Sequence, residues 1–202
     1  MKLYYSPGAC SLSPHITAIE AGIPIELEKV DTKTHQTQSG KDFYALNPKG
    51  YVPALELDNG ELLTEGPAIV QYLADLKPES GLAPANGTLA RYRLQEMMGY
   101  INSELHKSFS PLFNPNTSAE VREEKANYLR KRFALVEAIL AKQPYLLGDQ
   151  FTVADGYLFV VTNWANYVKL DISEFPALLA FQKRVGGRPA VQQAMRAEKL
   201  IK

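Results

Sequence analysis

The opening stretch MKLYYSPGACSLSPHI (residues 1–16) holds the pattern that decides the fold of the N-terminal part of the chain. Residues 2–5 favour a β-strand, and the Ser-Pro-Gly sequence at 6–8 ends that strand with a turn. Apolar side chains then recur at helical spacing over residues 11–22, which predicts a helix. Cys10, the only cysteine, therefore lies between the end of a strand and the start of a helix.

Further elements follow outward from this stretch. Residues 25–30 favour a second strand, residues 31–40 a polar loop, and a short helix precedes Asn47. The sequence Asp-Asn-Gly at 58–60 stands between two apolar runs and predicts a hairpin, because Asn-Gly adopts the positive φ of a tight turn. A helix over residues 66–76 completes a small α/β unit that is thioredoxin-like in outline.

The remainder of the chain favours helices alone. Two apolar stripes at helical spacing predict amphipathic helices. They consist of Leu94, Met98, Ile101 and Leu105, and of Leu129, Phe133, Val136 and Leu140. Residues 152–168 are apolar nearly all round and predict a buried central helix, with Thr152 and Asp155 placed as a capping box at its start. Prolines at 176 and 189 begin two further helices.

These patterns predict a two-domain fold class. An α/β, thioredoxin-like domain is expected over residues 1–80 and an all-α domain over residues 88–202. Residues 81–87, within a stretch rich in proline and glycine, are the expected linker.

The composition excludes several classes of partner. Lysine plus arginine and aspartate plus glutamate both number 22, so no basic field points to nucleic acid or to an anionic membrane surface. No signal-peptide pattern or membrane-spanning apolar run is present, and a single cysteine favours a reducing, cytoplasmic location. Clustered histidine and cysteine spacing is missing, so no metal site is expected, and neither is a glycine-rich phosphate loop.

Cys10 is a candidate for thiol chemistry. Unpaired amides and the dipole at the start of a helix favour the thiolate form. The sequence at 10–13 is C-x-x-S, so no second thiol in this motif can resolve a mixed disulfide, and an outside thiol such as glutathione would be needed. A buried structural cysteine is the alternative, and position alone favours neither hypothesis.

Two neighbouring motifs predict a site for a small zwitterionic peptide. Val52 before Pro53 is a natural place for a cis peptide bond, and the strand edge there could pair with an extended peptide. Glu65 and Gly66 stand just before a helix, where amides can hold a carboxylate and Glu65 an ammonium. An ordinary helix cap beside an edge strand is the alternative for each motif alone.

A third set of candidates lies in the helical part. On an ideal helix Gly99, Asn102, Ser103 and His106 share a face that is rotated away from the apolar stripe. His106 could donate to a sulfur or act as an acid or base, and a solvated surface histidine is the alternative. The cases for the other two histidines, His15 and His35, are weaker.

Five motifs now make a family resemblance visible over nearly the whole chain. They are MKLYYSPGACSLSPHI, NPKGYVPAL, LLTEGPAIVQYLAD, ELHKSFSPLF and TVADGYLF, and in this order they resemble a bacterial beta-class cytosolic glutathione S-transferase. The resemblance implies a homodimer. It also implies that Cys10 faces the glutathione sulfur and can form a mixed disulfide with it.

The same resemblance implies roles for the other motif residues. Tyr51 and Val52, with Pro53 cis, would pair with the cysteinyl backbone, and Glu65 and Gly66 would hold the γ-glutamyl end. The active-site cleft would be lined by Ser103, Glu104 and His106, some of them reaching across from the partner subunit.

Three positions depart from the usual pattern of that family. His35 stands where a lysine is usual, with Lys33 as an alternative cation for the glycyl carboxylate. Gly99 replaces an asparagine, and Gly66 replaces a serine. We therefore expect glutathione to bind, but more weakly than in a typical member.

The resulting functional hypothesis is a glutathione transferase that uses glutathione as cosubstrate, with no permanently bound cofactor. It would conjugate the glutathione thiolate to small hydrophobic electrophiles and catalyse glutathione-dependent thiol–disulfide exchange at Cys10. The alternatives are a catabolic dehalogenase or isomerase that uses glutathione, and a non-catalytic binder of hydrophobic ligands or glutathione adducts.

Overall fold

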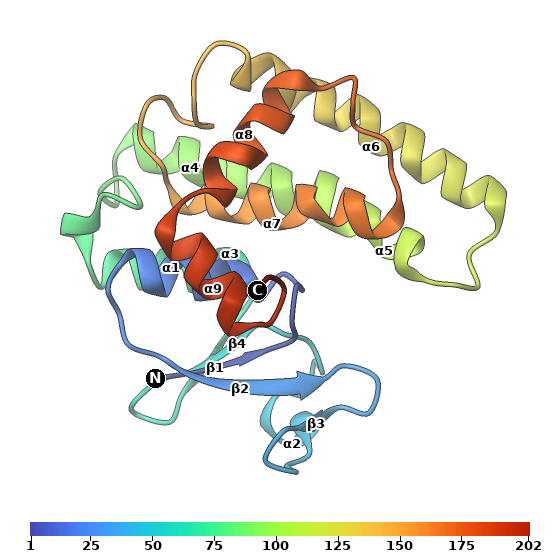
Figure 1. The fold of residues 1–202 in the computed structure, drawn as a ribbon. Helices are drawn as coiled ribbons and strands as arrows, with labels where there is room; N and C mark the ends of the chain where they lie inside the picture. The colour runs from blue at the N-terminus through green and yellow to red at the C-terminus, as the bar shows by residue number, and fades with distance from the viewer. The chain divides into compact units, whose positions relative to one another are not determined.

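The computed structural model describes all 202 residues, which form two compact units. The first comprises Met1–Ala83 together with Arg188–Lys202, and the second comprises Pro84–Gly187. The C-terminal segment thus differs from the sequence-based division, which placed residues 88–202 in one helical domain. Its helix α9 (Pro189–Ala197) packs against α1 (Leu12–Glu20) of the first unit (Figure 1). An amphipathic pattern predicts that a helix is half-buried but not which surface it covers.

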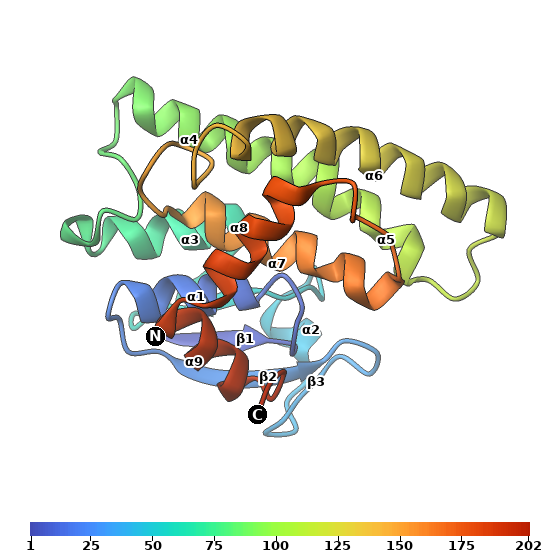
Figure 2. The same ribbon diagram turned by 45° about the horizontal axis from the view of Figure 1, so that its top comes forward.

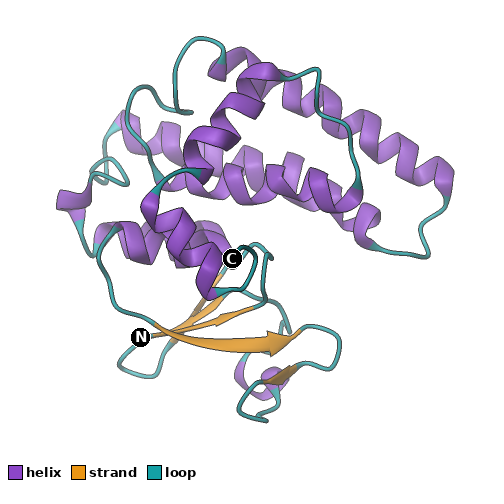
Figure 3. Ribbon diagram, viewed as in Figure 1, coloured by secondary structure: helices purple, strands orange, loops and turns teal.

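The first unit is built on a five-stranded mixed sheet (Figure 3). Its strands are β1 (Lys2–Tyr5), β2 (Glu26–Asp31), β3 (Gln36–Thr37), β4 (Ala54–Glu56) and β5 (Leu62–Thr64). In the order β3-β2-β1-β4-β5, only β1 and β2 run parallel. The predicted strands and hairpin are present. The segment 31–40 is expected to be a loop, but it contains the two-residue strand β3. The segment has no apolar run from which a strand could be predicted.

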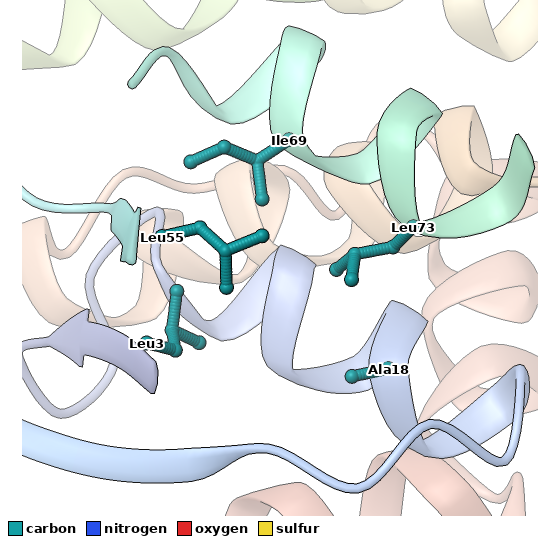
Figure 4. Close-up of a cluster of buried hydrophobic side chains, with 5 residues drawn as sticks. All are labelled: Leu3, Ala18, Leu55, Ile69 and Leu73. Carbon is teal, nitrogen blue, oxygen red and sulfur yellow. The ribbon is translucent and has the colours of Figure 1, made fainter. Parts of the chain in front are cut away.

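Side chains that alternate along β1 fill the cores on the two faces of this sheet. Leu3 packs with residues of α1, β4 and α3 (Gly66–Asp75) in the fully buried cluster Leu3, Ala18, Leu55, Ile69 and Leu73 (Figure 4). Tyr4 points to the opposite face and packs against Phe43 of α2 (Phe43–Leu46), together with Val30, Val52 and Ala54. Each large side chain buried here contributes about 1.5–3 kcal/mol. The strand ends beside Cys10 are therefore fixed from both faces.

The second unit is entirely helical. It contains α4 (Leu89–Tyr100), the π-helical turn η2 (Ile101–His106), α5 (Lys107–Phe113), α6 (Ala119–Leu140), α7 (Val153–Val168) and α8 (Pro176–Gly186). Both predicted apolar stripes are buried, and α7 is enclosed as expected, in contact with α4, α5 and α8 (Figure 2). A short 3₁₀ turn, η1 (Pro78–Ser80), precedes this unit. None of the helices has the length and apolarity that a membrane crossing requires.

Candidate active site

Cys10 lies in the tight turn that links β1 to α1. Gly8 adopts a positive φ of 71°, and the amides of Ala9 and Leu12 donate to the carbonyls of Ser6 and Ala9 at 3.1 and 3.0 Å. The thiol is half-buried and donates to the carbonyl oxygen of Val52 at 3.3 Å. The side chain thus faces the start of β4 and is not enclosed in the core.

Residues 50–53 form the partner segment of this cysteine. The Val52–Pro53 peptide bond is cis, as the sequence predicts. The side-chain amide of Asn47 donates to the Tyr51 carbonyl at 2.8 Å, while the Tyr51 side chain is 69% exposed. Val52 and Pro53 are buried, so this segment is anchored from behind and presents its backbone next to the thiol.

Glu65 stands at the start of α3 in a strained backbone conformation. Its φ is 70°, which is rare for a residue with a side chain and is found preferentially at functional sites. Its carboxylate pairs with the ammonium of Lys49 at 2.7 Å, which also donates to Thr64 Oγ1 at 3.0 Å. Sequence reasoning missed Lys49, although it lies inside the NPKGYVPAL motif. A Cβ at Gly66 would lie 3.6 Å from Pro53 Cγ, an ordinary contact, so a serine would fit there.

His35 and Lys33 occupy different environments in the loop after β2. His35 has a φ of 54°, and its ring packs on Tyr44 with centroids 4.3 Å apart and Nε2 3.2 Å from the tyrosine hydroxyl. Lys33 is exposed, and its amide donates to the Asp31 carboxylate. The imidazole of His35 is therefore tied to Tyr44, a neighbour that sequence reasoning did not single out.

Replacing Gly50 with alanine tests whether the contact between His35 and Tyr44 helps to hold the neighbouring Tyr51 backbone in place for glutathione. A Cβ at Gly50, where φ is 67°, would lie 2.5 Å from Tyr44 Cε1 and would push Tyr44 and His35 aside. We expect a loss of about 1–3 kcal/mol in stability and a raised KM for glutathione. The matched control is Gly60→Ala, which has a φ of 85° but open space around its Cβ. An equal rise in KM in both variants would contradict the coupling.

The candidates of the second unit lie on the π-helical turn. The sequence predicts an ideal α-helix here, and this prediction is wrong because residues 101–106 form i→i+5 bonds. Ser103 is exposed and donates to the Gly99 carbonyl at 3.0 Å. Glu104 instead faces α6, where it accepts from Tyr128 at 2.5 Å and pairs with Arg132 at 2.9 Å.

His106 contacts residues of α7 from this turn. Its Nδ1 lies 2.6 Å from the hydroxyl oxygen of Tyr157, which donates to Asn102 Oδ1 at 3.0 Å. Trp164 packs edge-on against the imidazole with centroids 4.8 Å apart. Sequence reasoning missed Tyr157 and Trp164, because residues on a helix that is apolar all round are indistinguishable from plain core.

A thioredoxin-like unit with a cis-proline beside a cysteine, continued by a helical unit, defines the class of two-domain glutathione transferases. The family model for the glutathione S-transferase N-terminal domain matches residues 8–76, and that for the C-terminal domain matches residues 100–189.

Proteins that are similar to this chain over nearly its full length belong to the same class. Glutathione S-transferase GstA of Escherichia coli O157:H7 is 46% identical, with 99% of this chain and 100% of that protein covered. The bacterial glutathione S-transferase BphK, solved as a ternary complex, is 59% identical with a TM-score of 0.97, covering 98% of this chain and 100% of the other.

Two further structures, a sphingomonad enzyme solved with glutathione and a bacterial beta-class enzyme from Sphingomonas chungbukensis, are 48% and 45% identical. Both have a TM-score of 0.96 and cover 100% of both chains. The chain belongs to the glutathione S-transferase family.

Proposed function

We propose that this glutathione S-transferase conjugates the thiolate of glutathione to small hydrophobic electrophiles. The observation that carries the proposal is the Cys10 thiol 3.3 Å from the Val52 carbonyl, next to the cis Val52–Pro53 bond. A peptide that pairs with the backbone of Tyr51 and Val52 would bring its cysteinyl sulfur to Cys10. Glutathione acts as the cosubstrate, and no permanently bound cofactor is required.

The remaining candidate residues are proposed to bind the two ends of glutathione. Glu65 and the backbone of Gly66 hold the γ-glutamyl end, and the Lys49–Glu65 pair at 2.7 Å keeps the carboxylate in position. Lys33 or His35 contacts the glycyl carboxylate. The family resemblance assigns Gly99, Ser103, Glu104 and His106 to glutathione binding as well, although the carboxylate of Glu104 is bonded to Tyr128 and Arg132 of α6.

A second reaction is proposed for the same site, namely thiol–disulfide exchange. The Cys10 thiolate attacks the glutathione sulfur of a mixed disulfide, forming a Cys10–glutathione disulfide and releasing the other thiolate. A glutathione thiolate then attacks that disulfide, which forms oxidised glutathione and returns the Cys10 thiolate. Cys10 is the only cysteine of the chain, so the second step requires an external thiol.

A homodimer in the cytoplasm is the proposed working form. The resemblance of the chain to bacterial beta-class enzymes supports the dimer, and the single cysteine supports a reducing compartment. Sedimentation equilibrium at micromolar concentration tests the assembly. A monomer under those conditions contradicts this part of the proposal.

Turnover of a panel of aromatic and alkyl electrophiles with glutathione tests the main reaction. The expected result is glutathione-dependent conjugation of at least one electrophile with saturation by both substrates. Saturable binding without turnover across the panel would instead favour the non-catalytic binder. Halide release or isomerisation without conjugate would favour the catabolic alternative.

The double substitution His35→Lys with Gly99→Asn tests the departures from the family pattern. A Cβ at Gly99 meets no atom within 4 Å, so an asparagine has room, and a lysine restores a cation beside the glycyl carboxylate. We expect glutathione to bind about 5- to 30-fold more tightly, as one or two added polar contacts provide. Ala134→Asn, on an exposed face of α6, is the control. Unchanged affinity measured by titration calorimetry would show that the departures are silent.

A further inference from the structure

The hydroxyl of Tyr157 joins His106 to Asn102 in one hydrogen-bonded chain. Its oxygen lies 2.6 Å from His106 Nδ1 and 3.0 Å from Asn102 Oδ1. The tyrosine is only 2% exposed, so water has little access to compete for these bonds. Asn102 and His106, four residues apart on the π-helical turn, both reach this hydroxyl.

Counting protons along this chain indicates which tautomer a neutral imidazole would adopt. A phenol carries one hydrogen, and Tyr157 donates it to the amide oxygen of Asn102. With that hydrogen on Asn102, the bond between Tyr157 and Nδ1 is donated by the ring, so a neutral imidazole would carry its proton on Nδ1. Nε2 is left as the acceptor atom of the ring. Edge-on packing of Trp164, at an interplanar angle of 73°, limits rotation of the imidazole.

We propose that Tyr157 and Asn102 are positioning residues that hold His106 in the Nδ1-protonated tautomer, so that its Nε2 can accept a proton. The inference rests on the proposed function for the use of that lone pair, namely removal of the thiol proton of the cosubstrate. The tautomer itself is a property of this unit and is measurable without any reaction.

The tautomer can be read from nitrogen-15 NMR of histidine-labelled protein in mildly alkaline buffer. The chain has three histidines, and a His106→Phe variant assigns the resonance. The expected spectrum shows Nδ1 of His106 in the protonated range and Nε2 in the unprotonated range. A wild-type spectrum with the proton on Nε2 overturns the proposal.

Substitutions of Asn102 give the sharper test. In Asn102→Ala the phenol loses its acceptor and is expected to donate to His106 Nδ1, which moves the imidazole proton to Nε2 although both rings remain. Asn102→Asp keeps an acceptor oxygen and is expected to retain the wild-type tautomer. Ser110→Ala, an exposed residue of α5, is the matched control. An unchanged tautomer in Asn102→Ala overturns the proposal.

Steady-state kinetics then separate this inference from the proposed function. Asn102→Ala and Tyr157→Phe are expected to lower kcat about 10-fold or more, with KM for glutathione changed less than about 2-fold, and Asn102→Asp to restore most of kcat. A tautomer that switches without any change in kcat would uphold the positioning of the proton and overturn its use in catalysis. Turnover absent from the wild-type protein would contradict the proposed function and leave the NMR result standing.

Discussion

The Cys10→Ala variant is expected to lose glutathione-dependent disulfide reduction by about 10³-fold or more while it retains conjugation within about 10-fold. In the exchange reaction the Cys10 sulfur forms and breaks the covalent bond, so its removal leaves no nucleophile. In conjugation the cosubstrate supplies its own thiolate, and Cys10 is only its neighbour beside the Val52 carbonyl. Reduction of a mixed disulfide and conjugation of an aromatic electrophile, measured on the same preparation, check the two expectations.

Cys10→Ser is the matched control for this experiment. A serine hydroxyl can still donate to the Val52 carbonyl, which lies 3.3 Å from the thiol in the wild type, but it is no nucleophile for a disulfide. Conjugation by the serine variant should therefore equal or exceed that of the alanine variant, with disulfide reduction lost in both. If both reactions survive in Cys10→Ala at the wild-type rate, the proposed role of Cys10 in exchange is wrong.

The parts of the fold that sequence predicts well are those set by local patterning. Leu3 and Tyr4 alternate between the two faces of the sheet because successive side chains of a strand must do so. The hairpin at 58–60 follows from the positive φ of Gly60, which is 85°. Local chemistry also predicts the cis bond before Pro53 and the capping box at Thr152.

The parts that sequence does not predict depend on partners distant along the chain. The π-helical turn is one example, since Ile101–His106 has no residue that marks it and an ideal helix was the natural expectation. Tyr157 is another, because its hydroxyl is defined by Asn102 and His106, more than fifty residues away. The strand β3 and the docking of α9 likewise depend on backbone or surface partners that no periodicity encodes.

Asp155→Asn is the substitution with the largest expected effect on stability. Asp155 is fully buried, and its carboxylate accepts from the amides of Leu146 and Thr152, both at 2.8 Å, and from the Thr152 hydroxyl at 2.9 Å. An asparagine places an NH₂ group where an acceptor oxygen stood, so at least one buried donor loses its partner. We expect a loss of about 2–4 kcal/mol near pH 4, where the folded carboxyl is protonated, seen in urea unfolding.

The same variant reveals a pH dependence whose sign is fixed by Asp155. Burial raises its pKa to about 6 from an ordinary value of 3.8, an effect that outweighs the hydrogen bonds from Leu146 and Thr152. Between these two values the folded protein holds more protons than the unfolded chain, so this group makes the unfolding free energy fall as pH rises from about 4 to about 7. The difference in unfolding free energy between wild type and Asp155→Asn should therefore decrease across that range by on the order of 3 kcal/mol.

Unfolding curves of both proteins across the same pH range provide the measurement. Asp171→Asn is the control, because Asp171 is an exposed aspartate of the same unit whose pKa is lowered by the amide of Ser173. That variant should stay close to wild type in stability at every pH, since an exposed turn contact is partly replaced by water. A difference between wild type and Asp155→Asn that grows as pH rises would mean that the hydrogen bonds to the carboxylate outweigh its desolvation, and that the pKa of Asp155 is lowered.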